Sequence, residues 1–518
     1  MVPESVSPAK LHRLLRPPWS DLVIIAACVL SLTLYIAMSW SQMGGPGYPL
    51  DDAWIYQTYA RNLAHHGQWA FIAGVPSTGS TSLLWTPLLV PGYLLPIHPF
   101  WWTQLAGLGA LMAAALGAAR LAEGGPTPAP LVSGLAVAGA WQVVWAAASG
   151  METALFAALI LWFWVWFTRH KPAAGAARSR DGLLLGLWCG VLMLARPEGV
   201  LAAGVAGLYG VLVLRSEWKR LVRWGLMAAL GFALILVPFF AMNYAISGAW
   251  WPNTFYAKQT EYAALYELPY ILRLFQQAGV SMVGAQILLI PGLVILLWRG
   301  IKEADKALVV LPLAWVGLHW MLYAARLPVI YQHGRYAIPT VPVILVLGIN
   351  GMFTLIQPAA QRFITRVASL GWPLAFAASH LAVLIVLGAP AYVADTAFIE
   401  DEMVATARWI EANTSSTDVV AAHDIGALGY FAPRPLIDLA GLVSPAVIPI
   451  MHDPSALALF IEARGADYLV IFPNWSDAYR MLASDPMFCP VWDASQEAGY
   501  VMRSGLGPMT VYSLCSTP

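Results

Sequence analysis

The chain has 518 residues, of which 59% are hydrophobic and only 11% are charged, whereas about a quarter of the residues in a soluble globular protein are charged. This composition excludes an ordinary soluble enzyme, and its apolar content excludes a disordered chain. The 28 Lys and Arg residues balance the 28 Asp and Glu residues, so no excess positive charge is available to attract a nucleic acid. We therefore predict a mainly α polytopic membrane protein.

Eleven apolar stretches have, or nearly have, the length of about 20 residues that a membrane-spanning helix needs. They lie at approximately 22–40, 101–120, 130–148, 151–168, 182–195, 199–214, 224–246, 280–298, 308–325, 336–356 and 371–392. A further apolar piece, 83–97, contains three prolines, and each proline removes a backbone donor. We expect this piece to lie along the membrane interface or to re-enter the membrane rather than to cross it.

Basic residues predict the orientation, because loops rich in Lys and Arg stay in the cytoplasm. If residues 1–21 are inside, the inner segments carry 17 Lys and Arg residues and the outer loops carry 6. The first apolar stretch, at about 19 residues, exceeds the roughly 7–15 of a signal peptide, so we interpret it as a retained span. The sequence thus predicts a multi-pass protein of the cell membrane, with a cytoplasmic N-terminus and an extracytoplasmic C-terminus.

Two domains are expected from a change of character near residue 395. Residues 1–395 form the transmembrane domain, with a first outer loop at 41–100, and residues 396–518 form an extracytoplasmic α/β domain with short strands near 418–424 and 466–472. Two of the four cysteines, Cys489 and Cys515, lie in this tail. Outside the cytosol they could form a disulfide, and the sequence leaves the bonded and the free states open.

Asp51 and Asp52 open the first polar cluster, just before a helical pattern in which Ile55, Tyr59 and Leu63 recur every four residues. An Asp before a helix is a good N-cap, and one cap needs only one carboxylate. The other carboxylate, partly desolvated at the membrane boundary, is a candidate general base. We favour Asp51 as the base, because Asp52 is closer to the helix and better placed to cap it.

Two further clusters lie at turns between spans. Glu152 either caps the helix that follows it or contacts a sugar hydroxyl. Arg196 and Glu198 either form an ion pair within their turn or leave Arg196 free to bind phosphate, for which a guanidinium group is well shaped.

Three more clusters combine aromatic, basic and acidic residues. They are Asn253, Tyr256 and Lys258; His333, Arg335 and Tyr336; and His423 and Asp424. The basic residues of the first two either anchor helix ends at the membrane surface or bind an anion. The third follows a strand, where it either caps a turn or contacts a ligand, since open α/β folds bind ligands at strand ends.

All of these clusters fall on the outer side of the predicted topology. Ionisable groups near the hydrocarbon are costly to bury, so several on one side indicate a site. An enzyme that passes a sugar from a lipid phosphate to an acceptor hydroxyl needs one carboxylate base and cations that stabilise the departing phosphate. This set of residues meets that need, and a single base without a second nucleophile predicts inversion at the anomeric carbon.

The motifs, taken in order, resemble those of the integral-membrane GT-C glycosyltransferases, especially the branch with the mycobacterial terminal arabinofuranosyltransferase. They are Asp51-Asp-Ala-Trp-Ile-Tyr, Gly150-Met-Glu-Thr153, Ala195-Arg-Pro-Glu198, Pro252-Asn-Thr-Phe-Tyr-Ala-Lys258, Arg335-Tyr336 and Asp424-Ile-Gly-Ala-Leu-Gly-Tyr430. The resemblance implies a polyprenyl-phosphate sugar donor, a glycan, lipid or protein acceptor, inversion, and an acidic residue of the first outer loop, here Asp51 or Asp52, at the reaction centre. Some members of the superfamily need a divalent cation and others do not, and no metal ligand is assigned here.

The main alternative is a membrane transporter or lipid flippase whose outer polar residues form a substrate vestibule. Transporters often contain two-fold internal repeats with helices broken at corresponding places. We find no such repeat in the sequence, which favours the glycosyltransferase.

Overall fold

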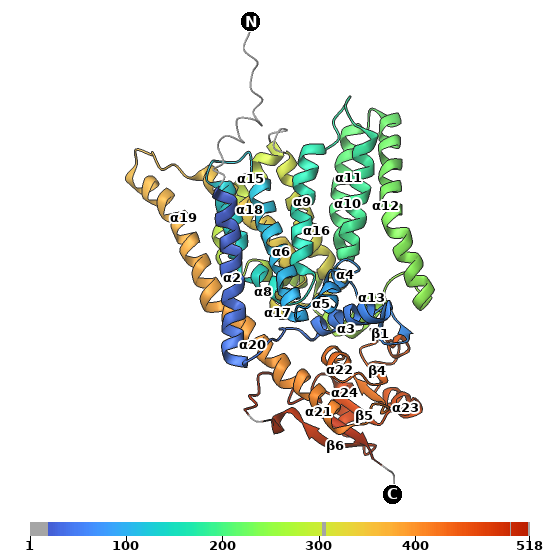
Figure 1. Cartoon of the computed structure of the whole chain (residues 1–518). Coiled ribbons are helices and arrows are strands. Elements are labelled where there is room, and N and C mark those ends of the chain that lie inside the picture. Colours follow the sequence, from blue (N-terminus) through green and yellow to red (C-terminus); the bar gives the residue numbers. More distant parts are fainter. Residues whose placement is uncertain (1–18, 303–306, 498, 516–518) are drawn as a thin grey trace.

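The structure is a computed structural model that describes residues 19–302, 307–497 and 499–515. A bundle of long helices is joined at one end to a small domain that contains a β-sheet (Figure 1). We call this end of the bundle the domain end and the opposite end the far end. Residues 1–18 and Lys306, which belong to predicted cytoplasmic segments, lie outside the described residues.

Nine described helical segments are long and apolar enough to cross a membrane. They contain α2 (Trp19–Met43), α6 (Pro99–Leu121), α9 (Thr153–His170), α11 (Val200–Leu214), α12 (Trp218–Ser247), α15 (Ile290–Lys302), α16 (Ala307–Arg326), α18 (Val341–Leu355) and the run from α19 (Phe363–Val383) through α20 (Ala389–Ile399) to α21 (Ala405–Asn413). The predicted span 130–148 is a pair of helices, α7 (Ala129–Ala138) and α8 (Trp141–Ala148), bent by 50°. The predicted span 182–195 is α10 (Ser179–Ala195), a helix of only 17 residues.

A stripe of glycines explains how the short helix α10 is held in the bundle. Gly182, Gly186 and Gly190 recur every four residues, so they lie on one face of α10. A Cβ atom on Gly186 would lie 1.9 Å from the carbonyl oxygen of Ala228 in α12. Small residues allow membrane helices to approach closely, and α10 therefore packs directly against the backbone of α12.

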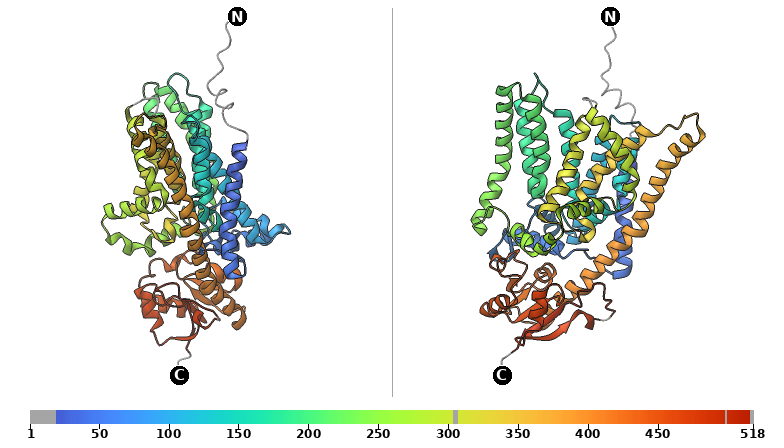
Figure 2. Two further views of the ribbon diagram at one scale, coloured as in Figure 1. Left: turned by 90° about the vertical axis from the view of Figure 1, so that its left-hand side faces the viewer. Right: turned by 180° about the vertical axis from the view of Figure 1, so that it is seen from behind.

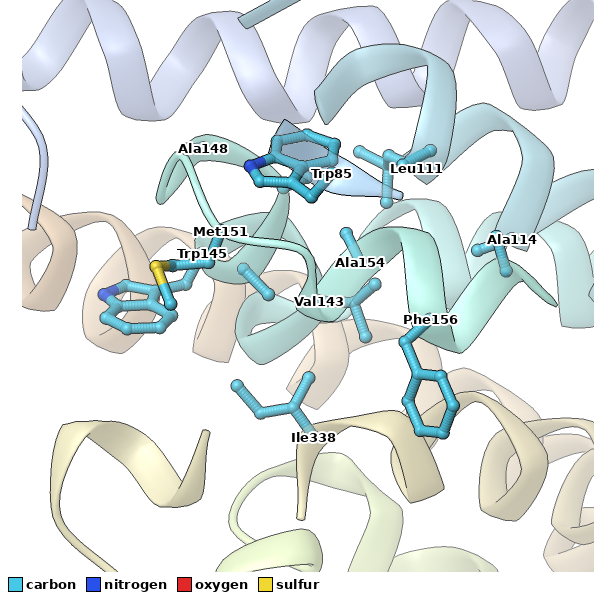
Figure 3. Close-up of a cluster of buried hydrophobic side chains, with 14 of the residues drawn as sticks. Trp85, Leu111, Ala114, Val143, Trp145, Ala148, Met151, Ala154, Phe156 and Ile338 are labelled. Atoms are coloured by element: carbon cyan, nitrogen blue, oxygen red, sulfur yellow. The ribbon is translucent and has the colours of Figure 1, made fainter. Parts of the chain in front are cut away.

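The apolar core lies beside the turn that carries Glu152. Buried side chains from α6, α8, α9 and the turn Ile338–Thr340 meet there (Figure 3). The indole Nε1 of Trp85 donates a hydrogen bond of 2.7 Å to the carbonyl of Gly150. Gly150 has a φ of +78°, and a Cβ atom there would lie 2.9 Å from the ring of Tyr48. The turn thus requires glycine, and the core fixes the position of Glu152.

The first outer loop folds against the domain end of the bundle. It contains α3 (Asp51–His66), β1 (Ala70–Ile72), β2 (Val75–Pro76), α4 (Trp85–Leu89) and α5 (Pro91–Leu94). The proline-rich piece 83–97 forms only the two short helices α4 and α5, which confirms that it does not cross as a span. Further along the chain, α13 (Asn253–Glu261) and α17 (Tyr331–Gly334) also lie at the domain end (Figure 1), and α14 (Tyr270–Ser281) contacts α17.

The C-terminal domain contains a five-stranded mixed sheet with the order β4-β3-β5-β7-β6. The strands are β3 (Val420–Ala422), β4 (Leu436–Asp438), β5 (Tyr468–Ile471), β6 (Phe488–Asp493) and β7 (Thr510–Leu514), and the helices are α22 (Gly426–Phe431), α23 (Pro454–Ala463) and α24 (Asp477–Ala483). Strand β3 pairs in parallel with β4 and β5, whereas β7 is antiparallel to β5 and β6. The two strands expected near 418–424 and 466–472 are confirmed as β3 and β5.

A disulfide cross-links this domain, and a continuous helical run connects the domain to the bundle. Cys489 and Cys515 form a disulfide that joins β6 to the residue after β7, which settles the state that the sequence left open. The helical run from α19 to α21 passes from the far end of the bundle into the C-terminal domain, as Figure 2 shows. It therefore crosses the predicted boundary at residue 395 as a continuous helix.

Candidate active site

Asp51 links the first outer loop to the C-terminal domain. Its two carboxylate oxygens accept backbone hydrogen bonds from Gly426, at 2.7 Å, and from Ala427, at 2.8 Å. These N–H groups are at the start of α22, where a carboxylate is favoured. Helix α3 itself begins at Asp51, with Leu50 as its N-cap residue and no side-chain cap. The prediction that Asp52 caps this helix is therefore wrong.

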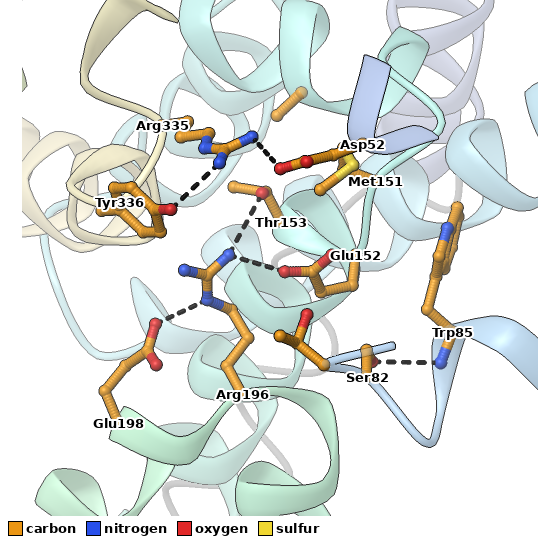
Figure 4. Close-up of polar contacts among 12 residues, drawn as sticks. Asp52, Ser82, Trp85, Met151, Glu152, Thr153, Arg196, Glu198, Arg335 and Tyr336 are labelled. Atoms are coloured by element: carbon orange, nitrogen blue, oxygen red, sulfur yellow. Dashed lines mark hydrogen bonds and ion pairs between the residues drawn. The ribbon is translucent and has the colours of Figure 1, made fainter. Parts of the chain in front are cut away.

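Asp52 lies between two positive side chains. Its Oδ2 is 2.7 Å from Nη1 of Arg335 and 3.2 Å from Nζ of Lys258. Figure 4 shows Arg335 reaching Asp52 on one side and Tyr336 on the other, where Nη2 donates a hydrogen bond of 3.0 Å to the phenol oxygen. The buried Nε of Arg335 has no hydrogen-bond partner in the described part of the chain. This group, which we call the Asp52 cluster, pairs two cations with one carboxylate and has one donor left over.

The two aspartates differ in protonation as well as in contacts. Burial on its own would raise the pKa of Asp52, but the ammonium of Lys258 and the guanidinium of Arg335 hold that pKa well below its usual range. Burial and the nearby carboxylate of Asp424 raise the pKa of Asp51, and its two backbone hydrogen bonds offset this only in part. Their different surroundings thus lower the pKa of Asp52 and raise the pKa of Asp51.

Arg196 is surrounded by acids rather than open to a ligand. Its Nη1 is 2.7 Å from Oε1 of Glu152, and its Nε is 2.5 Å from Oε1 of Glu198. The side chains of all three are at most 7% exposed, and Tyr323 donates a hydrogen bond of 2.5 Å to Glu198 (Figure 4 shows the three charged groups). In this Arg196 cluster two carboxylates face one cation, which favours the predicted ion pair over a phosphate contact.

Glu152 occupies the N-cap position of α9, but its side chain makes no capping hydrogen bond. It points instead to Arg196, from which it accepts a hydrogen bond. The capping interpretation of Glu152 is therefore wrong, because its carboxylate faces the buried guanidinium of Arg196 and not the backbone N–H groups of α9.

His333 and Arg335 face different partners. Nε2 of His333 lies 2.7 Å from Oδ2 of Asp395 in α20, and the indole of Trp145 donates a hydrogen bond of 2.9 Å to the same oxygen. His333 and Gln332 have φ values of 58° and 54°, in a left-handed turn that is strained for residues other than glycine. This turn separates the two side chains, so the single anion site expected from both is not formed.

His423 connects the C-terminal domain to α13. Its Nε2 is 3.1 Å from Glu261 at the end of α13, and its Nδ1 is 3.1 Å from Asp424. Burial disfavours the imidazolium, but the surrounding acidic groups, led by Tyr479 and Asp424, raise the pKa of His423 well above its usual value. A charged His423 thus fixes α13, the helix that carries Lys258.

The remaining predicted contacts lie on α13. Asn253, the first residue of α13, is buried, and its backbone N–H donates a hydrogen bond of 3.3 Å to the hydroxyl of Thr78. Tyr256 is 40% exposed, with its ring against Phe255. Asn253 therefore helps to seat α13, while substrate contacts by Asn253 and Tyr256 stay predictions.

Three residues of these clusters were missed from the sequence. They are Glu261, Tyr323 and Asp395. Asp395 carried a usable signal, because it is the one charged residue of the mostly apolar helix α20, and such residues usually have a partner. Glu261 and Tyr323 lie among ordinary polar and aromatic residues, where only tertiary contacts distinguish them.

A divalent cation, which the resemblance allows, does not fit these residues. Within the described ranges, no group of three or more His, Cys, Asp or Glu side chains could hold a metal ion. Both carboxylate oxygens of Asp51 accept hydrogen bonds from backbone N–H groups, and Asp52 lies beside two cations. We derive no step through a metal.

Sequence comparison reaches only the C-terminal part of the chain. A family described as a domain of unknown function (DUF8728) matches residues 393–512. No curated protein matches the chain in sequence.

Solved structures resemble nearly the whole chain. ArnT from Cupriavidus metallidurans, bound to undecaprenyl phosphate, is 14% identical, with a TM-score of 0.56 over 95% of this chain and 97% of that one. The chain has the fold of the GT-C glycosyltransferases. The same GT-C fold is seen in the Archaeoglobus fulgidus oligosaccharyltransferase AglB in complex with an inhibitory peptide and a dolichol-phosphate (12% identity, TM-score 0.58, 90% and 71% coverage). Mycobacterial arabinofuranosyltransferase AftD matches with 16% identity and a TM-score of 0.50 over 95% of this chain but 41% of its own length.

Proposed function

We propose that this protein is an inverting glycosyltransferase that moves a sugar from a polyprenyl-phosphate donor to a hydroxyl of an extracytoplasmic glycan, lipid or protein. The GT-C fold supports a membrane glycosyltransferase, and two of the solved structures that share the fold contain a polyprenyl phosphate. The observation that carries the proposal is the Asp52 cluster, in which one carboxylate neutralises only one of two cations.

The charge of the cluster suits the phosphate of such a donor. Lys258 and Arg335 approach the same oxygen of Asp52, and the Nε of Arg335 offers a further donor. Hydrogen bonds between a cation and a phosphate are about twice as strong as neutral ones. Because carboxylate and phosphate both accept such charge-assisted bonds, an incoming phosphate would compete with Asp52 for the two cations and leave Asp52 less stabilised as an anion.

This exchange makes Asp52, rather than Asp51, our choice for the general base. When its cations turn to the phosphate, the pKa of Asp52 rises toward the ordinary carboxylate value, and Asp52 becomes a better proton acceptor. Asp51 has both oxygens occupied by backbone N–H groups. We assign to Asp51 the role of docking the C-terminal domain, which revises the preference drawn from the sequence.

The proposed reaction is a single displacement. Asp52 accepts the proton of the acceptor hydroxyl, the acceptor oxygen forms a bond to the anomeric carbon, and the bond from that carbon to the phosphate oxygen breaks. The electron pair leaves with the polyprenyl phosphate, whose charge Lys258 and Arg335 stabilise. Attack from the face opposite the leaving group inverts the anomeric carbon.

The proposed location is the cell membrane, with the domain end on the extracytoplasmic side. The disulfide in the C-terminal domain supports this sidedness, because disulfides persist in oxidising compartments. At the far end, Arg120 in the last turn of α6 is 2.8 Å from Asp21, and Arg169 in the last turn of α9 is 3.1 Å from Glu123. We also propose a domain boundary at 395–396, which the family match from residue 393 supports.

Purified protein supplied with a panel of undecaprenyl-phosphoryl sugars tests the proposal. We expect wild type to release undecaprenyl phosphate and to glycosylate an acceptor, and Asp52→Asn to slow transfer by about 10²- to 10⁴-fold, the usual contribution of a general base. Asp51→Asn should retain most of the transfer rate, since its amide oxygen still accepts one of the two backbone hydrogen bonds.

Asp477→Asn is the matched control, because Asp477 is 90% exposed on the C-terminal domain. Equal rates of sugar transfer by wild type and Asp52→Asn would show that Asp52 is not the general base. Movement of the lipid across vesicles without any sugar transfer would favour the transporter or flippase.

A further inference from the structure

A cleft separates the first outer loop from the C-terminal domain, at the opposite end of α3 from Asp52. Its volume is about 800 Å³, and it lies between the last turns of α3, the β1–β2 hairpin, the end of α22 and the segments around β4 and α23. Sites for small molecules usually have volumes of about 300–1,000 Å³. The cleft is thus large enough for a ligand of its own.

The charged side chains that line the cleft are all positive. They are Arg61, Arg434 and Arg464, and no described Asp or Glu lines it. Arg434 is paired with Glu411 at 2.9 Å. Arg61 instead donates to two backbone carbonyls at the end of α22 and lies over the ring of Tyr430. Neutral partners leave the charge of Arg61 uncompensated.

Arg464 is the arginine most accessible to a ligand. It is exposed at the end of α23, and its guanidinium lies over the ring of Phe460 at 4.8 Å. Neither Arg61 nor Arg464 has a salt bridge within the described part of the chain. The cleft therefore has a surplus of two positive charges, which favours an anionic ligand.

The rest of the lining suits a saccharide. Phe460 provides partly exposed aromatic surface and Ser444 adds a hydroxyl group, whereas Phe71 and Ser77 are buried in the wall of the cleft. Predominantly apolar walls with a few polar groups are typical of ligand pockets. Such a surface can hold the apolar faces of sugar rings while the arginines hold an acidic substituent.

The position of the cleft relative to Asp52 defines which part of a substrate it could hold. Asp52 and Arg61 are nine residues apart on α3, or about 14 Å at 1.5 Å per residue. A group bound in the cleft is therefore remote from the reacting hydroxyl. Helix α22 lies beside α3 between these two positions, because its first residue donates a hydrogen bond to Asp51 and a carbonyl in its last turn accepts one from Arg61.

We infer that this cleft binds an anionic saccharide segment of the acceptor, several sugar units away from the hydroxyl that is glycosylated. The protein would thereby select acceptors that carry carboxylate or phosphate groups over neutral glycans. This inference rests on the proposed glycosyltransferase function.

Binding of defined oligosaccharides to the full-length protein in detergent tests the inference. The probes are tetragalacturonate, maltotetraose that carries one phosphate, and neutral maltotetraose, each measured by calorimetry. We expect at least one anionic probe to bind about 10-fold more tightly than the neutral one, and the stronger of the two identifies the acidic group. Arg464→Gln should weaken that binding about 5- to 10-fold, and Ala446→Trp, which fills the cleft, should weaken it further.

Arg480→Gln is the matched control, because Arg480 is 61% exposed on the same domain and does not line the cleft. Equal binding of anionic and neutral probes, or unchanged binding by both cleft variants, would overturn the inference. Release of undecaprenyl phosphate, measured in parallel, separates the two proposals. If the release of undecaprenyl phosphate depends on Asp52 but the binding of no oligosaccharide depends on Arg464, the cleft inference alone fails. If oligosaccharide binding depends on Arg464 but wild type releases no undecaprenyl phosphate, the proposed function alone fails.

Discussion

The Asp52 cluster and the Arg196 cluster both lie at the domain end of the bundle, yet their charges are opposite. The first has two cations for one carboxylate, and the second has two carboxylates for one cation. The acids of the Arg196 cluster are also less accessible, with exposed fractions of 4% and 6% against 25% for Asp52. The Arg196 cluster is enclosed and carries no surplus positive charge, so it holds helices together, whereas the Asp52 cluster carries a surplus positive charge and is more accessible, so it is free to take an anion.

The largest effect should come from breaking the closed cluster. Arg196→Met would leave Glu152 and Glu198 buried without a cation, and removal of one partner from a buried ion pair costs about 3–5 kcal/mol. We expect a strongly lowered thermal unfolding temperature in detergent. Arg480→Met, which removes an arginine that is 61% exposed from its pair with the exposed Asp477, is the control and should have little effect. An Arg196→Met protein that is fully stable yet unable to bind donor would move the phosphate site to Arg196.

A smaller effect, on catalysis rather than on folding, is expected in the open cluster. Lys258→Met should lower kcat/KM about 10- to 100-fold, the value of one charge-assisted hydrogen bond. It should also raise the pKa of Asp52, because one of the two cations that hold this pKa low is lost. Asp52 then takes up its proton at a higher pH, so the acid limb of the kcat/KM profile moves to higher pH. An acid limb at the wild-type position would show that Asp52 is not the group that titrates.

The smallest effect concerns the support of the open cluster by the C-terminal domain. The pKa of His423 is raised in the folded protein, so the stability that it contributes is complete below its unfolded pKa of about 6.5 and is lost as pH rises through the folded value. His423→Gln should therefore lower the free energy of unfolding by about 1–2 kcal/mol at pH 6, and the difference from wild type should shrink toward pH 9. A difference that grows with pH would contradict a charged His423 bound to Glu261.

Much of the architecture could be predicted from the chain alone. Runs of apolar residues indicate membrane helices because each must satisfy its own backbone, and short apolar runs beside helical patterns indicated β3 and β5. The bend between α7 and α8 was not predicted, since residues 130–148 read as one apolar run. The sequence indicates that α10 is short, but it does not show that the glycines of α10 pack against α12.

The candidate site was predicted as a set of residues but not as a set of pairs. The predicted topology groups Asp52, Lys258 and Arg335 on one side, and the structure places them together, although more than 200 residues separate the first two. They do not show which cation meets which acid. The sequence alone is compatible with a cap at Glu152 and an anion site at His333, whereas packing pairs Glu152 with Arg196 and His333 with Asp395.

The affinity for undecaprenyl phosphate tests the central claim most directly. It should be measured by calorimetry for wild type, for Arg335→Met, and for Arg503→Met as an exposed arginine that pairs with Asp401 away from the Asp52 cluster. We predict that Arg335→Met binds the lipid about 10- to 100-fold more weakly, whereas Arg503→Met binds it as wild type does. Equal affinity of all three proteins would contradict the assignment of the donor phosphate to the Asp52 cluster.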